Sequence, residues 1–462
     1  MSSSLPSRIL SNQPPLTVGF ISLGCPKNLV DSQVMAGVLL KSGLTLAPAP
    51  EEADVVVVNT CAFIDTARAE SVEAIREACD LKQNGTCRAV VVAGCLSQRY
   101  RESLWEELPE VDAFIGLDEL DGIAAVVREV AAGGRGVMLV SGEARRLFEP
   151  EATFPVFSGG AYAYLKIAEG CNHACAFCAI PGIRGRHRSR PLDAIVREAE
   201  RLLGMGFREL DLISQDVTYY GRDKAHGAGI PALLRALGAI GGKFWIRLLY
   251  AYPTHVSDEV LAAMGEVPQV CRYLDVPIQH SHPAILRAMR RANTIEPVAD
   301  LAARCRAILP DIALRITCLV GFPGETEEHF QHLLEHVRVV EFDHLGAFTY
   351  SPEEGTPAHS MEGRPAPAVA EERRARLMEA QREIVDRKAR SRIGTEDEVL
   401  LDKPAGKADV WLGRSRREAP EIDGAILVRR ARNASPGIFV RARFTGQDEY
   451  NMEAVASYKT GG

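Results

Sequence analysis

The sequence lacks any continuous apolar run of about 18 residues or more, the length that a helix needs to cross a bilayer. Residues 1–15 are rich in Ser and Pro and hold no apolar segment of the kind that a secretory signal peptide requires. We therefore expect a cytoplasmic protein with no membrane partner, and we interpret residues 1–15 as a disordered tail.

The sequence also lacks an excess of positive charge. Its 54 Lys and Arg residues are outnumbered by 61 Asp and Glu residues, which gives a formal net charge of −7 at pH 7. A protein that binds nucleic acid nonspecifically normally carries a basic field over much of its surface. The charge balance excludes that class for the chain as a whole, although it is compatible with a local basic patch.

The apolar content of 46% and the charged content of 25% are ordinary for a soluble globular protein. At 462 residues the chain is long for one hydrophobic core, so we expect about two to four domains. It contains 11 cysteines. In a chain without an export signal, cysteines indicate metal or redox chemistry before they indicate disulfides.

Cys171, Cys175 and Cys178 form a C-x3-C-x2-C run just after the strand-like segment Tyr162–Ile167. A cubane iron-sulfur cluster normally takes four cysteine ligands. Three cysteines with no fourth nearby therefore predict a cluster with one open iron. Zinc is the alternative, but it needs a fourth ligand, and His173 lies badly for this purpose inside the same tight turn.

Between Thr17 and about Val140, continuous Val and Ile runs alternate with segments whose apolar residues have helical spacing. This pattern is typical of an open α/β domain with a buried parallel sheet. Three further cysteines each follow the carboxyl end of a predicted strand in this region. Ligands bind at that edge of an open α/β sheet. We therefore predict a second three-thiolate cluster, also with an open iron, on Cys25, Cys61 and Cys95. Of the other five cysteines, we interpret Cys87 as a plain residue in a turn, and the rest as buried structural residues, namely Cys79, Cys271, Cys305 and Cys318.

A longer βα series follows and predicts a partial, open TIM-like barrel whose chemistry lies at the strand carboxyl ends. Polar residues at four of these ends, Gln215 and Asp216 among them, predict a lined pocket. Arg247 and Arg315 lie inside strands, where each could meet a ligand carboxylate in the barrel mouth or pair with a structural acid. The candidate strands are Tyr162–Ile167, Glu209–Ser214, Phe244–Tyr250, Arg272–Val276, Leu314–Val320 and Leu345–Tyr350, with helices that include Leu192–Leu203, Ile285–Arg291 and Glu327–Val340.

The end of the chain has another pattern. A charged connector helix is expected over about residues 370–393, and short β-rich pieces after it predict a small OB-like β-barrel. Acids and bases nearly cancel there, which weakens a nucleic-acid interpretation of this barrel. The predicted organisation is an N-terminal α/β domain at 16–140, a linker at 141–160, the partial barrel with its connector helix at 161–393 and the small barrel at 394–462.

The C-x3-C-x2-C run, with Phe177 before its last cysteine, resembles the signature of the radical S-adenosylmethionine (SAM) enzymes. The whole arrangement resembles the methylthiotransferase family within that superfamily, whose six cysteines match those named above position by position. The C-terminal piece is similar to that family's TRAM domain. The segments Ser22–Asn28, Ser214–Gly221 and Tyr350–Thr356 resemble the RimO branch, which modifies ribosomal protein uS12, whereas the tRNA-modifying branch typically has Asn in place of Asp216.

The resemblance implies two 4Fe-4S clusters and SAM as cofactors. The cluster on Cys171, Cys175 and Cys178 would reduce SAM to a 5′-deoxyadenosyl radical that takes a hydrogen from the β-carbon of an aspartate in uS12. The cluster on Cys25, Cys61 and Cys95 would hold the sulfur, which a second SAM methylates before its transfer. The SAM-binding residues expected are Phe177, which would pack near the adenine, and Gln215, Asp216, Arg247 and Arg315.

We expect no catalytic residue beyond the cluster ligands to be identifiable from the sequence. The expected partners are uS12, an electron donor and a sulfur source, and the chain is expected to be a monomer. Two alternative functions stay open. One is a tRNA adenosine methylthiotransferase with the same chemistry, and the other is a noncatalytic iron-sulfur scaffold that binds the ribosome.

Overall fold

The computed structural model describes residues 16–147, 156–225, 227–406 and 409–457. The predicted tail, residues 1–15, and part of the predicted linker, residues 148–155, lie outside the described residues, and the predicted domain boundaries stay a prediction. The described chain forms two compact units. The first comprises residues 16–62 and 66–142, and the second comprises residues 63–65, 143–147 and the chain from 156 onward.

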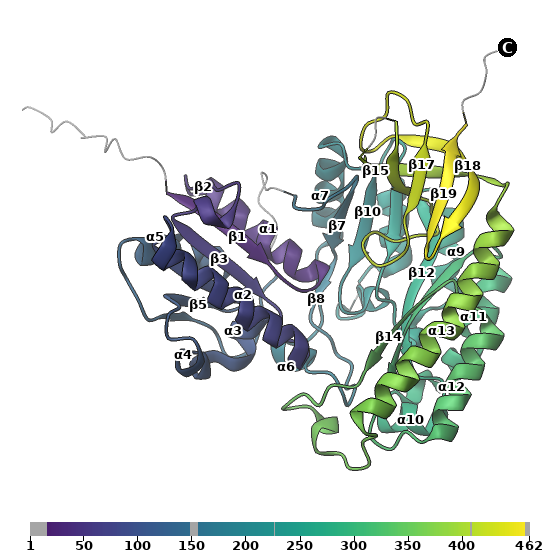
Figure 1. The fold of residues 1–462 in the computed structure, drawn as a ribbon, viewed down its shortest axis with the longest axis horizontal. Helices are drawn as coiled ribbons and strands as arrows, with labels where there is room; N and C mark the ends of the chain where they lie inside the picture. Colours follow the sequence, from purple (N-terminus) through teal and green to yellow (C-terminus); the bar gives the residue numbers. More distant parts are fainter. Residues whose placement is uncertain (1–15, 148–155, 226, 407–408, 458–462) are drawn as a thin grey trace, which may run out of the picture. The chain divides into compact units, whose positions relative to one another are not determined.

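The first unit contains a parallel six-stranded sheet in the order β2-β1-β3-β4-β5-β6 (Figure 1). Every residue of the two central Val-rich strands β3 and β4 is buried, which explains why these runs have no polar alternation. The predicted buried parallel sheet is confirmed, and the short strands β2 and β6 form its two edges. The strands are β1 (Thr17–Ser22), β2 (Thr45–Leu46), β3 (Val55–Thr60), β4 (Ala89–Gly94), β5 (Ala113–Ile115) and β6 (Val137–Leu139), and the helices are α1 (Pro26–Lys41), η1 (Pro50–Glu52), α2 (Asp65–Asn84), α3 (Cys95–Tyr100), η2 (Arg101–Ser103), α4 (Leu104–Glu107), η3 (Leu120–Gly122) and α5 (Ile123–Ala131).

The second unit is built on a six-stranded parallel sheet that runs in chain order, β7-β10-β11-β12-β13-β14. No pairing joins β14 back to β7 within the described residues, so the predicted open, partial barrel is confirmed. The strands are β7 (Tyr162–Lys166), β10 (Glu209–Ile213), β11 (Trp245–Leu248), β12 (Val270–Gln279), β13 (Ala313–Val320) and β14 (His344–Thr349), with the short pair β8 (Ala168–Glu169) and β9 (Arg188–Ser189) beside them. The helices are α6 (Ile180–Arg184), α7 (Leu192–Gly204), η4 (Val217–Tyr219), α8 (Ile230–Gly238), η5 (Pro253–His255), α9 (Asp258–Glu266), α10 (Pro283–Ala288), η6 (Ala292–Thr294), α11 (Ile295–Ile308), α12 (Glu327–Val340) and η7 (Pro357–Ser360).

One predicted helix, Ile285–Arg291, is shifted in the structure, where α10 runs from Pro283 to Ala288. The His282 side chain accepts the Ala284 backbone N–H at 3.2 Å and so caps the start of the helix. Pro283 follows as the first helical residue, a position that suits its fixed φ. The chain leaves the helix before Arg290, whose φ of 56° is left-handed. The prediction placed both ends of this helix too late because it followed apolar spacing and overlooked the cap.

The long helix α13 (Pro367–Arg392) connects the open barrel to the C-terminal strands, as predicted, and buries Leu377 and Ile384 on its apolar side. Five strands then form a closed barrel in the order β15-β16-β17-β19-β18, which confirms the predicted small β-barrel. Its core includes Val399, Val428 and Phe444. Burial of a side chain the size of Phe444 contributes roughly 2 kcal/mol. The strands are β15 (Glu396–Pro404), β16 (Trp411–Arg414), β17 (Ile426–Arg429), β18 (Phe439–Asp448) and β19 (Asn451–Ala456).

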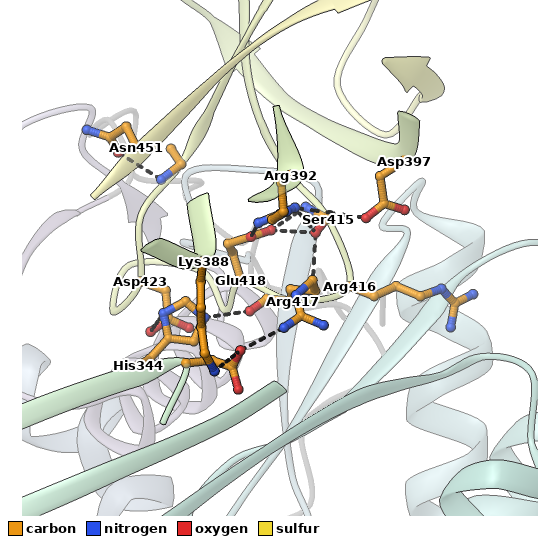
Figure 2. A network of polar contacts seen from close by, with 12 residues as sticks. His344, Lys388, Arg392, Asp397, Ser415, Arg416, Arg417, Glu418, Asp423 and Asn451 are labelled. Carbon is orange, nitrogen blue, oxygen red and sulfur yellow. Dashed lines mark hydrogen bonds and ion pairs between the residues drawn. The ribbon is translucent and has the colours of Figure 1, made fainter. Parts of the chain in front are cut away.

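A segment of the small barrel, residues 414–423, binds the amino-terminal ends of the open-barrel strands, and we call it the floor segment. Glu209, the first residue of β10, accepts a hydrogen bond from Arg414 at 2.6 Å. Tyr273 of β12 donates to Asp423 at 2.7 Å. The helix α13 also contacts the floor segment, since its last residue, Arg392, lies 2.6 Å from Glu418 (Figure 2). These buried polar bonds fasten the small barrel to the open barrel at the end opposite the strand carboxyl ends.

Candidate iron-sulfur and SAM site

Cys171, Cys175 and Cys178 lie in the loop between β8 and α6, and backbone hydrogen bonds hold this loop in place. The Cys171 N–H donates to the Gly185 carbonyl at 3.0 Å, and the Cys178 N–H donates to the Cys175 carbonyl at 3.2 Å. Gly170, just before the loop, has a φ of 72°, and a Cβ there would lie 2.1 Å from a backbone oxygen. Only glycine fits this position, so the sequence itself enforces the turn into the loop.

The three thiols are close enough to influence one another. Burial raises the pKa of the Cys171 thiol to about 12, with a further contribution from Cys175. Burial likewise raises the pKa of Cys178, with contributions from Cys175 and Cys171. Buried thiols that disfavour their charged form suit a metal cluster, because iron supplies the positive charge that stabilises thiolates. The donor set therefore fits a 4Fe-4S cluster with one iron left for another ligand.

His173 cannot complete a zinc site in this loop, because its ring is directed to Asp216. The His173 Nε2 atom lies 2.7 Å from an Asp216 carboxylate oxygen, and His255 Nδ1 lies 2.9 Å from the same oxygen. Ligands of a tetrahedral zinc ion would be separated by roughly 3.3 Å, given bonds of about 2.0 Å. The shorter separations are hydrogen-bond lengths, so we interpret these three residues as a hydrogen-bonded brace.

Asp216 follows β10 and begins η4, and protein donors engage both of its carboxylate oxygens. One oxygen accepts the backbone N–H groups of Thr218 and Tyr219 at 2.9 and 3.1 Å, and the other accepts the two histidines. Burial alone would raise the pKa of Asp216, but these hydrogen bonds outweigh it and hold the pKa below its usual value. The structure thus places Asp216 beside the cluster loop with its hydrogen-bonding capacity taken up by the protein.

Gln215, the residue before Asp216, differs from it in its hydrogen bonding. Its amide oxygen and nitrogen are both buried without a hydrogen-bond partner within the described residues, and the Ser214 hydroxyl shares this status. Unpaired buried polar atoms are costly, at about 1–3 kcal/mol each, unless a ligand satisfies them. Their location at the carboxyl end of a barrel strand fits a polar ligand such as SAM.

Phe177 packs from the cluster loop onto an apolar group that includes Met289, Phe322 and Tyr350, and remains partly exposed. One part of its ring is therefore buried against the protein and another is free to meet a ligand. This arrangement suits stacking against a planar group, as expected for the adenine of SAM.

Arg247 and Arg315 are not brought to the cluster loop. The Arg247 guanidinium lies 2.6 Å from Glu209 and also donates to the Arg416 carbonyl of the floor segment at 2.9 Å. Arg315 lies 3.0 Å from Asp275 and 3.4 Å from Asp423. Of the two possibilities that the sequence left open, pairing with structural acids is the one observed. Both side chains project inside the barrel toward the floor segment, below the strand carboxyl ends.

The first unit brings Cys25, Cys61 and Cys95 together at the carboxyl edge of its sheet. Asn28, which is 0% exposed, ties the three strand ends together. Its amide nitrogen donates to the carbonyl of Leu23 at 3.1 Å and of Thr60 at 2.8 Å, and its oxygen accepts the Cys95 thiol at 3.6 Å. A Cβ on Gly24 would lie 2.6 Å from the Cys61 Cβ, which shows how closely these strand ends approach.

Arg291 was not selected from the sequence, although the structure brings it to the cluster loop. An Arg291 N–H donates to the Cys175 sulfur at 3.3 Å across a separation of 116 residues. Such a distance in the chain leaves no local spacing to find. Cys79, Cys271, Cys305 and Cys318 are buried in the structure, as the sequence predicted, and Cys87, which was expected in a turn, is buried as well.

Three family profiles match the chain. Residues 17–116 match an uncharacterized protein family, UPF0004, residues 165–337 match the radical SAM superfamily, and residues 393–456 match the TRAM domain. Among the residues that the structure describes, none of the helices combines the length and apolarity needed to cross a membrane.

The chain is also similar to other proteins over nearly its full length. It is 44% identical over 436 residues to the ribosomal protein uS12 methylthiotransferase RimO of Geobacter sulfurreducens, covering 94% of this chain and 97% of that protein. Against RimO of Symbiobacterium thermophilum it is 46% identical over 453 residues, covering 97% and 93%.

Solved structures share the fold at low identity. The radical SAM methyltransferase TsrM from Kitasatospora setae, solved with cobalamin and a 4Fe-4S cluster, matches with a TM-score of 0.57 and 17% identity over 75% of this chain and 74% of that chain. The cobalamin-dependent radical SAM enzyme OxsB matches with a TM-score of 0.52 and 11% identity over 81% and 56%. These likenesses show that the architecture of this chain is shared with radical SAM enzymes.

Proposed function

Because the chain belongs to the RimO family of ribosomal protein uS12 methylthiotransferases, we propose that it adds a methylthio group to the β-carbon of an aspartate in uS12. The predicted family, enzyme class and cofactors are confirmed at the level of the family, which uses SAM and 4Fe-4S clusters. The assignment of individual residues and partners is the proposal developed below.

The observation that carries the proposal is the presence of two separate three-cysteine sites at strand carboxyl ends. Side-chain acids and bases cannot break an unactivated C–H bond, so the cofactors must supply the reactive species. When bound, the cluster at Cys171, Cys175 and Cys178 would supply an electron to SAM, and the cluster at Cys25, Cys61 and Cys95 would supply the sulfur. A single cluster would serve radical formation and leave sulfur delivery unexplained.

The other residues near the first cluster bind and orient. We assign Gln215 to SAM binding because its amide is buried and has no hydrogen-bond partner among the residues that the structure describes. Phe177 offers a partly exposed ring beside the cluster cysteines. Asp216 supports the loop through His173 and is a positioning residue. Arg247 and Arg315 are excluded from the proposed SAM-binding set because the floor segment and structural acids engage them.

The near balance of acids and bases in the small barrel favours a protein substrate over tRNA, and uS12 is the substrate of the family members. We propose a cytoplasmic location for the reaction, since its substrate would be a ribosomal protein. The reaction also requires a one-electron donor and a source of sulfide. We expect the enzyme to act as a monomer, and tRNA adenosine is the second candidate substrate because the same chemistry would serve it.

The test is the intact mass of uS12 from cells with and without this gene, together with nucleoside analysis of tRNA from the same cultures. Complementation with the unsubstituted gene and with the Cys175→Ala gene provides the matched pair. Loss of one methylthio increment from uS12, restored only by the unsubstituted gene, supports the proposal. Loss from a tRNA adenosine moves the substrate to tRNA. No change in either, with no 5′-deoxyadenosine formed from SAM by the purified protein, leaves a noncatalytic scaffold.

A further inference from the structure

Arg291 lies just after α10, and its long, charged side chain is only 4% exposed. Its two terminal nitrogens have different acceptors. One donates to the Cys175 sulfur at 3.3 Å, and the other donates to the Pro277 carbonyl in β12 at 2.9 Å. The guanidinium is therefore held between the open-barrel sheet and a predicted cluster ligand.

Tyr252 holds this guanidinium in place from the side. The central carbon of the Arg291 guanidinium lies 4.3 Å from the centre of the Tyr252 ring. The His173 ring stacks on Tyr252 at 3.6 Å between centroids, with an angle of 7° between the planes. Two groups this close to the ring centre cannot share one face, so tyrosine is sandwiched between imidazole and guanidinium.

The stack is anchored at its far end. His173 donates to Asp216, whose carboxylate is fixed by η4 and by His255. The chain of contacts thus runs from the carboxyl end of β10 through His173 and Tyr252 to Arg291 and Cys175. A guanidinium fixed on both sides keeps its direction, which a flexible surface arginine would not.

A buried, charged hydrogen-bond donor to a cluster sulfur has a defined electrostatic effect. One-electron reduction adds negative charge to a 4Fe-4S cluster, and hydrogen bonds to its sulfurs and nearby charge set its potential. A fixed positive charge stabilises the reduced form more than the oxidised form, and low exposure strengthens the effect. SAM cleavage needs the reduced form, so such a residue would govern the supply of electrons to the reaction.

We propose that Arg291 raises the reduction potential of the cluster held by Cys171, Cys175 and Cys178, and that Tyr252 and His173 are positioning residues for its guanidinium. This inference rests on the proposed function, because it requires that these cysteines hold a 4Fe-4S cluster. Arg291 is not a catalytic residue, since its contact is to a ligand of the cluster.

The test is a redox titration followed by electron paramagnetic resonance, with dithionite as the electron donor. The protein carries Cys25→Ala, Cys61→Ala and Cys95→Ala, so that one cluster contributes the signal. In that background we compare Arg291→Met, Arg291→Lys and Arg287→Met. Arg287 is exposed and lies in the last turn of α10, so it is the matched control for loss of a nearby positive charge.

Arg291→Met is expected to lower the ratio of reduced to oxidised cluster about tenfold at a fixed ambient potential, which corresponds to about 59 mV for a one-electron couple. Arg291→Lys keeps the charge and should recover part of the loss, whereas Arg287→Met should leave the potential unchanged. An unchanged potential in Arg291→Met, or an equal shift in Arg287→Met, would overturn the inference.

Two further readouts keep the failures apart. If Arg291→Met does not retain its cluster, Tyr252→Leu is titrated instead, because it keeps the guanidinium and removes its support. A drop in the reduced-to-oxidised ratio of about threefold, or about 28 mV for a one-electron couple, is then expected because the guanidinium is no longer held against the Cys175 sulfur, and an unchanged ratio overturns the inference. If the protein with Arg291 and Tyr252 intact shows no cluster signal on Cys171, Cys175 and Cys178, the proposed function itself fails.

Discussion

The two sets of cysteines are built in different ways. Cys171, Cys175 and Cys178 come from one loop, whereas Cys25, Cys61 and Cys95 come from the ends of three separate strands. The first set depends on local hydrogen bonds and on a stack of side chains. The second depends on the order of strands in a sheet and on one buried amide, Asn28. A local loop can thus be altered without disturbing its sheet, while the dispersed set exists only if the sheet folds.

The largest effect is expected from the loss of one cysteine of the loop set, which should affect SAM cleavage. Cys175→Ala should reduce formation of 5′-deoxyadenosine from SAM by more than the roughly 100-fold that loss of an outer-shell partner costs, because it removes a proposed cluster ligand. The measurement is product formation by liquid chromatography with anaerobically reconstituted protein. Cys318→Ala is the control, since this cysteine is buried in β13 and has no ligand role. Equal loss in both variants would contradict the assignment.

The converse substitution removes a cysteine of the dispersed set. Cys61→Ala should leave SAM cleavage within about twofold of the unsubstituted protein while methylthio transfer to uS12 falls below detection, because in our proposal the dispersed set delivers the sulfur. Both products are measured in one reaction, 5′-deoxyadenosine by chromatography and modified uS12 by intact mass. Transfer that persists in Cys61→Ala would show that the dispersed cysteines do not carry the sulfur.

Asn28→Ala should weaken cluster binding by the dispersed cysteines and leave the loop cysteines unaffected. The change leaves two backbone carbonyls without their side-chain donor, at a cost of about 1–3 kcal/mol, and frees the three strand ends from one another. We expect roughly tenfold weaker binding of the second cluster, so that iron per chain falls toward half after gel filtration. Gln83→Ala, an exposed change in α2, is the control. Unchanged iron content would argue against Asn28 as the tie.

The smallest effect on the chemistry is expected at the floor segment, which contributes stability instead. Glu418→Gln removes the negative charge that pairs with Arg392 at 2.6 Å and should lower the free energy of unfolding by roughly 3 kcal/mol. SAM cleavage should stay within about twofold, because the floor segment lies at the amino-terminal ends of the strands. Urea denaturation measures the first and product formation the second. Glu453→Gln, in an exposed pair with Arg429, should cost less than about 1 kcal/mol.

The same pair predicts a pH dependence. Burial would raise the pKa of Glu418, but Arg392 and Ser415 outweigh it and lower the pKa to about 2. A carboxyl group whose pKa is lowered in the folded state stabilises the protein at pH values above its ordinary pKa. This stabilisation is lost as the pH falls toward the pKa of the folded state. The difference in unfolding free energy between the unsubstituted protein and Glu418→Gln should therefore be constant from pH 7 to about pH 4.5 and shrink below it. A difference that grows on acidification would contradict this origin.

The site residues differ in how far their positions could be predicted. The loop cysteines are readable because three ligands within eight residues leave little choice of geometry. The dispersed cysteines are predictable only with the rule that parallel strands share one carboxyl edge. Arg247 and Arg315 could not be assigned, because alternation along a strand shows which face a side chain takes but not which end of the barrel its partner occupies. Arg291 could not be found at all.

The sequence by itself determined the open α/β sheet, the partial barrel, the small β-barrel and the two groups of cysteines, because hydrophobic periodicity and ligand spacing are local properties of the chain. Only the tertiary structure decided which polar residues serve the site. It turned His173 toward Asp216, stacked Tyr252 between His173 and Arg291, and directed Arg247 toward the floor segment. These outcomes depend on contacts between residues far apart in the chain. A buried charge is costly unless it is paired, so each buried charged side chain adopts the direction in which the fold offers a partner.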